Sequence, residues 1–209
     1  MAESAIMGPP MPSPFGHSLA GLAVAWAADL VPGDRAWRAA PASASWYRRA
    51  GNGLSVACAL LAMTPDLDLA FARHRSYTHS VGAVAVVGLL GAVAAYVLAP
   101  RHAVRIGITC AAAYASHLLL DWLGVDLYPP PGLQAFWPFD SGWYISGLDL
   151  FRQTRRNHLL TWPVFSQNLL AMAQELAILG PIALALWLVR VKALARFAPE
   201  KSRRDHPAQ

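Results

Sequence analysis

The sequence His74-Arg75-Ser76-Tyr77-Thr78-His79 leads directly into SVGAVAVVGLLGAVAAYVLA, a run of twenty residues (80–99) without a charge. At a rise of about 1.5 Å per residue, a helix of this length can cross the hydrocarbon core of a bilayer. Its small residues, Gly82, Gly88 and Gly91 among them, favour close packing between helices. The stretch therefore predicts a membrane-spanning helix with polar, ligand-type side chains at its entrance.

The composition of the chain also favours a membrane protein. The 209 residues are 56% hydrophobic and 14% charged, and the mean hydropathy is +0.34. Soluble domains carry about 25% charged residues, so the alternative is a soluble helical enzyme with an unusually Ala- and Leu-rich core. The net charge of +5 suits an anionic membrane surface. There is no basic patch interleaved with aromatic residues, which argues against nucleic acid as a partner.

Further apolar segments with helical patterns cover residues 16–31, 53–63, 102–122 and 169–189. The sequence thus predicts an all-α integral membrane bundle of about four to five apolar helices, with metal ligands gathered at one end. The last segment contains Glu175, to which the sequence assigns no role. Residues 32–52 and 124–167 are loop-like. We expect one membrane domain over residues 15–198, a disordered N-terminus over 1–14 and a disordered basic tail over 199–209.

Carboxylates and imidazoles, which are scarce in this chain, collect at the ends of the apolar segments. Two residues join 80–99 to 102–122, so these helices form an antiparallel hairpin that brings His79 to the same end as His117 and Asp121. The spacing of four places His117 and Asp121 on one helix face. If 16–31 and 53–63 also pair antiparallel, the remaining candidates reach that end too. The predicted metal ligands are His17, Asp66, Asp68, His74, His79, His117 and Asp121.

This ligand set predicts metal chemistry. Mixed carboxylates and imidazoles suit Zn²⁺, Mn²⁺ or Fe²⁺, and we expect zinc. The candidates outnumber the ligands of one four-coordinate ion, which favours two or more ions. Such a pair activates water and stabilises the leaving oxygen in phosphoester hydrolysis. Asp66, Arg75 and His79 are the expected catalytic residues, and Arg75 is expected to hold the phosphate through its planar fork.

Plainer roles are open for some of these residues. Asp66 follows Pro65 and could cap a turn. His74 could orient a ligand rather than bind the metal, and His17 could be an ordinary helix-start residue. Cys58 and Cys110 lie in apolar segments and are expected to be buried free thiols.

Several sequence blocks resemble those of a known family. Thr64-Pro65-Asp66-Leu67-Asp68, His74-Arg75-x-x-Thr78-His79-Ser80 and Ser116-His117-Leu118-Leu119-Leu120-Asp121 are similar to signature blocks of the bacterial LexA-binding, inner-membrane-associated hydrolases, also called membrane-bound metal-dependent hydrolases. His17-Ser18-Leu19 and the Pro-rich stretch to Trp137-Pro138 extend the resemblance to about residues 15–145. The resemblance implies metal dependence and hydrolysis. A more remote similarity links these blocks to zinc-dependent phospholipase C, whose later His and His-x-x-x-Glu have no clear counterpart here.

We therefore expect a multi-pass protein of the bacterial inner membrane that hydrolyses a phosphoester in a lipid or lipid-linked substrate. The alternative is a non-catalytic membrane protein in which the metal cluster is structural or regulatory and the function is partner binding. An open coordination position and a pocket beside Arg75 would favour the enzyme. A metal transporter is disfavoured because residues 80–99 are almost entirely apolar.

Charge and aromatic residues predict how the protein sits in the membrane. If all five segments cross alternately, the site end receives only five of the 17 Lys and Arg residues, namely Arg73, Arg75, Arg152, Arg155 and Arg156. Cytoplasmic loops carry the excess of Lys and Arg, so we predict a cytoplasmic C-terminus and a metal site at the outer face. Segment 53–63 is short for a full crossing and could be re-entrant. The loop 124–167, with Trp137 and Trp143, is predicted to roof the site at headgroup level, or else to be an ordinary interfacial anchor.

Overall fold

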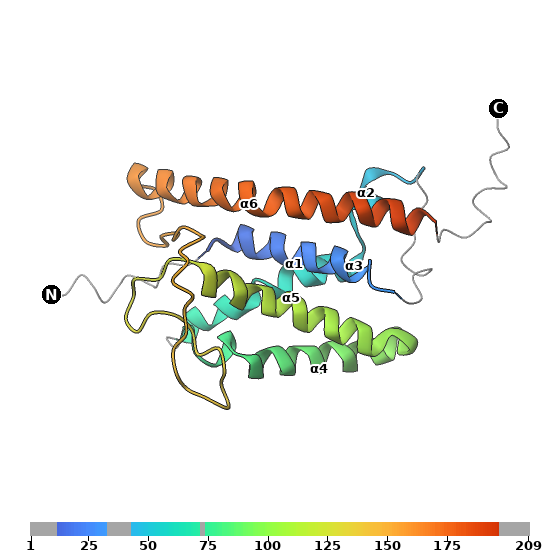
Figure 1. Cartoon of the computed structure of the whole chain (residues 1–209), viewed down its shortest axis with the longest axis horizontal. Coiled ribbons are helices and arrows are strands. Elements are labelled where there is room, and N and C mark those ends of the chain that lie inside the picture. Colours follow the sequence, from blue (N-terminus) through green and yellow to red (C-terminus); the bar gives the residue numbers. More distant parts are fainter. Residues whose placement is uncertain (1–11, 33–42, 72–73, 197–209) are drawn as a thin grey trace.

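The computed structural model describes residues 12–32, 43–71 and 74–196, and the helices in these ranges pack side by side in one bundle (Figure 1). The α-helices are α1 (Pro14–Ala28), α2 (Trp46–Ala50), α3 (Gly53–Leu61), α4 (Val81–Leu98), α5 (Ala103–Leu123) and α6 (Trp162–Ala195). Short 3-10 helices are η2 (Thr64–Phe71), η3 (Tyr77–His79) and η4 (Pro100–His102). The described ranges contain isolated bridges but no named strand, so the predicted all-α membrane fold is confirmed.

Three helical stretches are long and apolar enough to cross a membrane: Val81–Leu98, Pro100–Leu123 and Trp162–Ala195. α1 has 15 residues and α3 has 9, which are fewer than the roughly 20 that a perpendicular crossing needs. Half of the span in α5 is buried, against 6% in α4. α5 is therefore the central helix, and α4 turns an apolar surface outward, as a helix facing lipid does.

Local sequence signals explain where the helices begin. The Ser13 side chain accepts a hydrogen bond from the Gly16 amide and caps α1, whereas Asn52 opens α3 with a capping box. α6 begins at Trp162 rather than at residue 169, because Pro163 suits the first helical turn. Polar residues that follow Pro163 therefore belong to the helix. One of them, Asn168, forms hydrogen bonds with the backbone of Arg155 in the preceding loop. α2 lies in a stretch predicted as loop.

Small residues bring the helix backbones close together. α4 and α5 form the predicted antiparallel hairpin, and a Cβ added at Gly107 would lie 2.6 Å from the carbonyl oxygen of Gly88. On α1, a Cβ at Gly21 would lie 2.4 Å from the carbonyl oxygen of Cys58 on α3. Larger side chains would push these pairs apart. Cys58 and Cys110 are buried and form no disulfide, as predicted.

α1 is tied to α6 at both of its ends. At its start, the buried Glu175 of α6 accepts hydrogen bonds from the amide, at 2.6 Å, and from the hydroxyl of Ser13. Past its end, Arg190 Nε donates to Asp29 Oδ2 at 2.7 Å, and this ion pair is also buried. Ser13 and Pro14, which the sequence assigned to the disordered N-terminus, are thus ordered. The predictions for residues 1–11 and 199–209 fall outside the described residues.

Candidate metal centre

Six of the seven predicted ligands come from four elements that meet at one end of the bundle, and the seventh, His74, lies between η2 and η3. η2 carries Asp66 and Asp68, and η3 ends at His79. The last turns of α5 carry His117 and Asp121, and the first turn of α1 carries His17. The long loop between α5 and α6 lies at the same end (Figure 1). The structure therefore brings together the residues that hairpin topology predicted to converge.

Four side chains form the centre of the cluster. The Nε2 atoms of His79 and His117 lie 3.1 Å apart. Asp121 Oδ2 lies 3.1 Å from the His117 nitrogen and 3.4 Å from the His79 nitrogen. Asp66 Oδ1 lies 3.5 Å and 3.7 Å from the same two atoms. A tetrahedron with metal–ligand bonds of about 2.0–2.1 Å has edges of about 3.3 Å, so these separations have the size of a four-coordinate metal site.

The hydrogen bonds around the two imidazoles aim their lone pairs inward. Nδ1 of His117 lies 2.7 Å from the carbonyl oxygen of Ala62, which can only accept, so Nδ1 carries the proton. Nδ1 of His79 lies 3.2 Å from Asp68 Oδ2, which assigns its proton in the same way. Both Nε2 atoms then present lone pairs to one another. A cation between them removes the repulsion, and a divalent metal fits.

The carboxylates of the centre, like the imidazoles, have lone pairs without a donor. Asp66 Oδ1 and both oxygens of Asp121 are buried, and no hydrogen bond reaches them from the described part of the chain. A buried carboxylate oxygen without a partner is costly, so a cation is the expected neighbour. The donor set and its geometry therefore fit a divalent metal.

His17 and His74 extend the ligand set on either side. His17 Nε2 lies 3.4 Å from Asp121 Oδ1, and its ring stacks on that of His117 with 3.7 Å between centroids. Ligand atoms of His17, His117 and Asp121 lie within 4.8 Å of one another, and so do those of Asp66, His74 and His79. The cluster thus offers two groups of three residues that could each hold an ion.

Asp68 contacts imidazoles with both of its oxygens. Its Oδ1 lies 2.6 Å from His74 Nδ1, whereas Oδ2 accepts from the Thr78 hydroxyl and faces His79 Nδ1. A carboxylate in this position orients a ligating histidine and raises its basicity. The geometry therefore gives Asp68 an orienting position behind the histidines, where the sequence predicted a direct ligand.

The electrostatics of the cluster favour bound positive charge. Burial alone would raise the pKa of Asp66, but the neighbouring imidazoles of His117 and His79 hold it well below its usual range. The pKa of Asp68 is likewise lowered, because His74 and His79 outweigh burial. Burial would lower the pKa of His79, yet Asp66 and Asp68 raise it above 6.5. The carboxylates thus stay ionised and attract either a proton or a metal.

Arg75, the predicted phosphate ligand, instead binds residues of the loop between α5 and α6. It is only 5% exposed, and its guanidinium is ion-paired with Asp126. It also donates to the carbonyl oxygens of Tyr128 and Pro130, both at 3.3 Å. The Trp143 ring lies 5.6 Å from the guanidinium carbon. These contacts make Arg75 an anchor for the loop, which sequence reasoning did not foresee.

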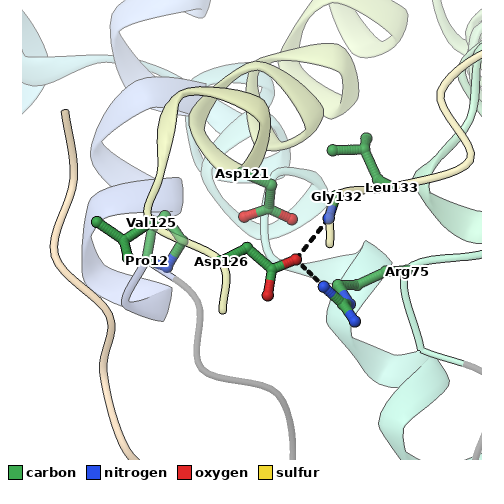
Figure 2. Close-up of a pocket in the computed structure, with 7 residues that line it drawn as sticks. All are labelled: Pro12, Arg75, Asp121, Val125, Asp126, Gly132 and Leu133. Carbon is green, nitrogen blue, oxygen red and sulfur yellow. Dashed lines mark hydrogen bonds and ion pairs between the residues drawn. The ribbon is translucent and has the colours of Figure 1, made fainter. Parts of the chain in front are cut away.

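A small pocket opens beside the cluster (Figure 2). It is lined by Pro12, Arg75, Asp121, Val125, Asp126, Gly132 and Leu133. Asp126 accepts a hydrogen bond from the Gly132 amide at 2.6 Å and fixes one wall. The pocket has room for about one water molecule. Water can therefore reach Asp121, and the loop after α5 forms part of the cover.

Two functional contacts were missed from the sequence. Arg156, in the loop before α6, donates from Nη2 to Asp66 Oδ2 at 2.8 Å. Glu175 holds Ser13, four residues before His17. An acid within an apolar helix is a functional candidate by default, so Glu175 carried a signal. No sequence signal marked Arg156 as functional, apart from its place in a loop predicted to lie at the site end.

Fold and cluster together define a multi-pass membrane protein with a buried set of imidazoles and carboxylates that could hold metal. A family model described as YdjM inner membrane protein matches residues 11–197, and the chain belongs to this family. The resemblance to an inner-membrane family is thus confirmed at that level, whereas hydrolysis and the similarity to phospholipase C stay predictions. No curated protein and no solved structure matches the chain.

Proposed function

We propose that this protein is a membrane-bound metal-dependent hydrolase that cleaves a phosphoester in a lipid or lipid-linked substrate. The observation that carries the proposal is the convergence of His79, His117, Asp66 and Asp121 at separations of 3.1–3.7 Å. These residues would hold a divalent ion, with zinc expected and manganese or iron as alternatives. Such an ion, when bound, would act as a Lewis acid towards water and the phosphoryl group.

The protein's own groups prepare the site for this chemistry. The Ala62 carbonyl and Asp68 fix the two imidazoles in the tautomer that ligation requires. Asp121 borders the water-sized pocket, so a carboxylate oxygen is available to orient a water and accept its proton. His17 and His74 are candidates to hold a second ion.

The surroundings support a lipid substrate. Phe139 in the loop is 87% exposed, and Leu160 and Trp162 at the start of α6 are also exposed. Large apolar side chains exposed at the end of a membrane bundle suit the lipid–water interface. We place this end at the outer face of the membrane, on the distribution of Lys and Arg.

One observation favours the alternative function, a structural or regulatory metal cluster. His17, His79 and His117 are fully buried, and the pocket beside them admits about one water. A closed site of this kind can stabilise a fold without turning over a substrate.

Metal analysis joined to activity assays separates the two functions. Purified protein should contain a divalent metal and hydrolyse a member of a panel of phosphomonoesters, phosphodiesters and phospholipids. His117→Ala and Asp121→Ala should lose both properties. Leu119→Ala is the matched control, because Leu119 lies between them on α5 and is 50% exposed. Unchanged metal content in both variants would overturn the site, and bound metal without turnover of any phosphoester would favour the alternative.

A further inference from the structure

Arg156 lies where the loop before α6 reaches the metal centre. Its Nη2 donates to Asp66 Oδ2 at 2.8 Å, and its side chain is 29% exposed. The other oxygen of the same carboxylate, Oδ1, faces the Nε2 atoms of His79 and His117. One carboxylate therefore separates a partly exposed guanidinium from the centre of the cluster.

We propose that Arg156 binds the anionic group of the substrate, which is a phosphate with an ionised oxygen next to the scissile bond. This inference rests on the proposed function and names its recognition residue. A guanidinium offers five donors in a planar fork that matches phosphate. One of them is used by Asp66, and Nε and Nη1 have no partner among the described residues. These donors are available to a phosphate oxygen.

Arg156 brings a positive charge to the edge of the cluster. Asp66 carries one negative charge, and the geometry offers it to both the metal centre and Arg156. A divalent ion with Arg156 would bring three positive charges to a cluster that holds the carboxylates of Asp66, Asp68 and Asp121, so the charges balance and the free donors of Arg156, rather than a net positive charge, favour an anion there. Arg75 does not supply this function, because it is buried and already paired with Asp126.

The loop that presents Arg156 is held firmly on α6. The Asn168 side chain accepts from the Arg155 amide and donates to the Arg155 carbonyl oxygen, each at 2.7 Å. The Gln174 side chain also binds the loop backbone. It accepts from the Arg152 amide and donates to the carbonyl oxygen of Leu150, each at 3.1 Å. The backbone is thus fixed one residue before Arg156. A guanidinium positioned in advance binds an anion with less loss of conformational entropy.

The test measures binding of inorganic phosphate to the full-length, metal-loaded protein in detergent, by calorimetry. Arg156→Gln should weaken phosphate binding by about tenfold to a hundredfold, the cost of a lost charge-assisted hydrogen bond. Its metal content should be unchanged, and Arg156→Lys should retain part of the affinity. Arg155→Gln is the matched control, because it removes the same charge from the residue next to Arg156. The Arg155 side chain is exposed.

The outcomes separate this inference from the proposed function. Equal phosphate affinity in the wild type and Arg156→Gln would overturn the inference, even if the wild type hydrolyses phosphoesters. Loss of metal in Arg156→Gln, with unchanged phosphate affinity per bound metal, would also overturn it and make Arg156 a positioning residue for Asp66. Arg156-dependent phosphate binding without any turnover would support the anion site and overturn the hydrolase. Tighter binding of short-chain phosphatidic acid than of phosphate would support a lipid headgroup as the source, and the reverse would support a soluble phosphate.

Discussion

The hydrogen bonds between Glu175 and Ser13 hold the turn of α1 that carries His17. Glu175 is fully buried, and its two oxygens accept from the amide and the hydroxyl of Ser13. The same hydroxyl accepts from the Gly16 amide at 3.1 Å, one residue before His17. An acid on a membrane-spanning helix thus fixes the start of α1, and we predict that it positions His17.

Replacing Glu175 with Leu removes both acceptors at once. Two buried donors on Ser13 then lack partners, and each costs about 1–3 kcal/mol, so the variant should lose about 2–6 kcal/mol of stability. Glu175→Gln keeps the shape, because its carbonyl oxygen accepts from the Ser13 amide and its NH₂ group donates to the hydroxyl. Only the hydroxyl proton of Ser13 then lacks an acceptor, so the loss should be about half that of the Leu variant, about 1–3 kcal/mol.

Thermal unfolding in detergent and metal analysis test this prediction together. The Leu variant should unfold at a lower temperature and bind less metal, because His17 is no longer fixed, whereas the Gln variant should show a smaller change in both measurements. An unchanged unfolding temperature and metal content in the Leu variant would refute the role of Glu175. Equal damage in both variants would show that the charge matters rather than the hydrogen bonds.

Four further predictions follow from the structure. Asp68→Asn should weaken metal binding by about 10–100-fold in chelator competition without unfolding the protein, because Asp68 orients His79; unchanged affinity would contradict this. Metal binding requires a deprotonated Nε2 on His79, and the pKa of this imidazole is raised above 6.5. The fraction of protein with bound metal should therefore fall as the pH drops through that raised pKa, and full metal occupancy at pH 5 would contradict ligation by His79. Replacing Trp137 and Trp143 with Asp should reduce membrane association and activity, and retention of both would exclude an interfacial roof. A reporter fused after Gln209 should be active only in the cytoplasm, and activity restricted to the other side would reverse the orientation.

The convergence of the ligands was predictable because it depends on chain topology. Only a two-residue link separates residues 80–99 from 102–122, so His79 had to lie near the exit of the second helix. His117 and Asp121 are four apart, and any α-helix places them on one face. These relations need neither side-chain packing nor loop conformation, and the structure has them as predicted.

The roles that depended on loop conformation were not predictable. Arg75 was expected at a phosphate, but the loop after α5 folds back and supplies Asp126 as its partner. Asp66 and Asp68 lie two residues apart on the same 3-10 helix, yet Asp66 faces the centre and Asp68 contacts His74 behind it. Arg156 reaches Asp66 from ninety residues away in sequence. Asn168 and Gln174, which hold the loop of Arg156, gave a faint signal as polar residues beside or within an apolar segment.

The two ties between α1 and α6 also have a consequence for biosynthesis. In chain order, α6 follows every other helix that the structure describes, so it is the last of them to leave the ribosome. Before Glu175 is inserted, Ser13 has no acceptor, and before Arg190 is inserted, Asp29 lacks its buried cation. A nascent chain that ends before α6 therefore lacks both of these ties, although Arg105 of α5 still donates to the Ala28 carbonyl oxygen at the end of α1. Assembly of the metal centre should accordingly be completed only after α6 is inserted, because this last helix fixes the start of α1, the first helix.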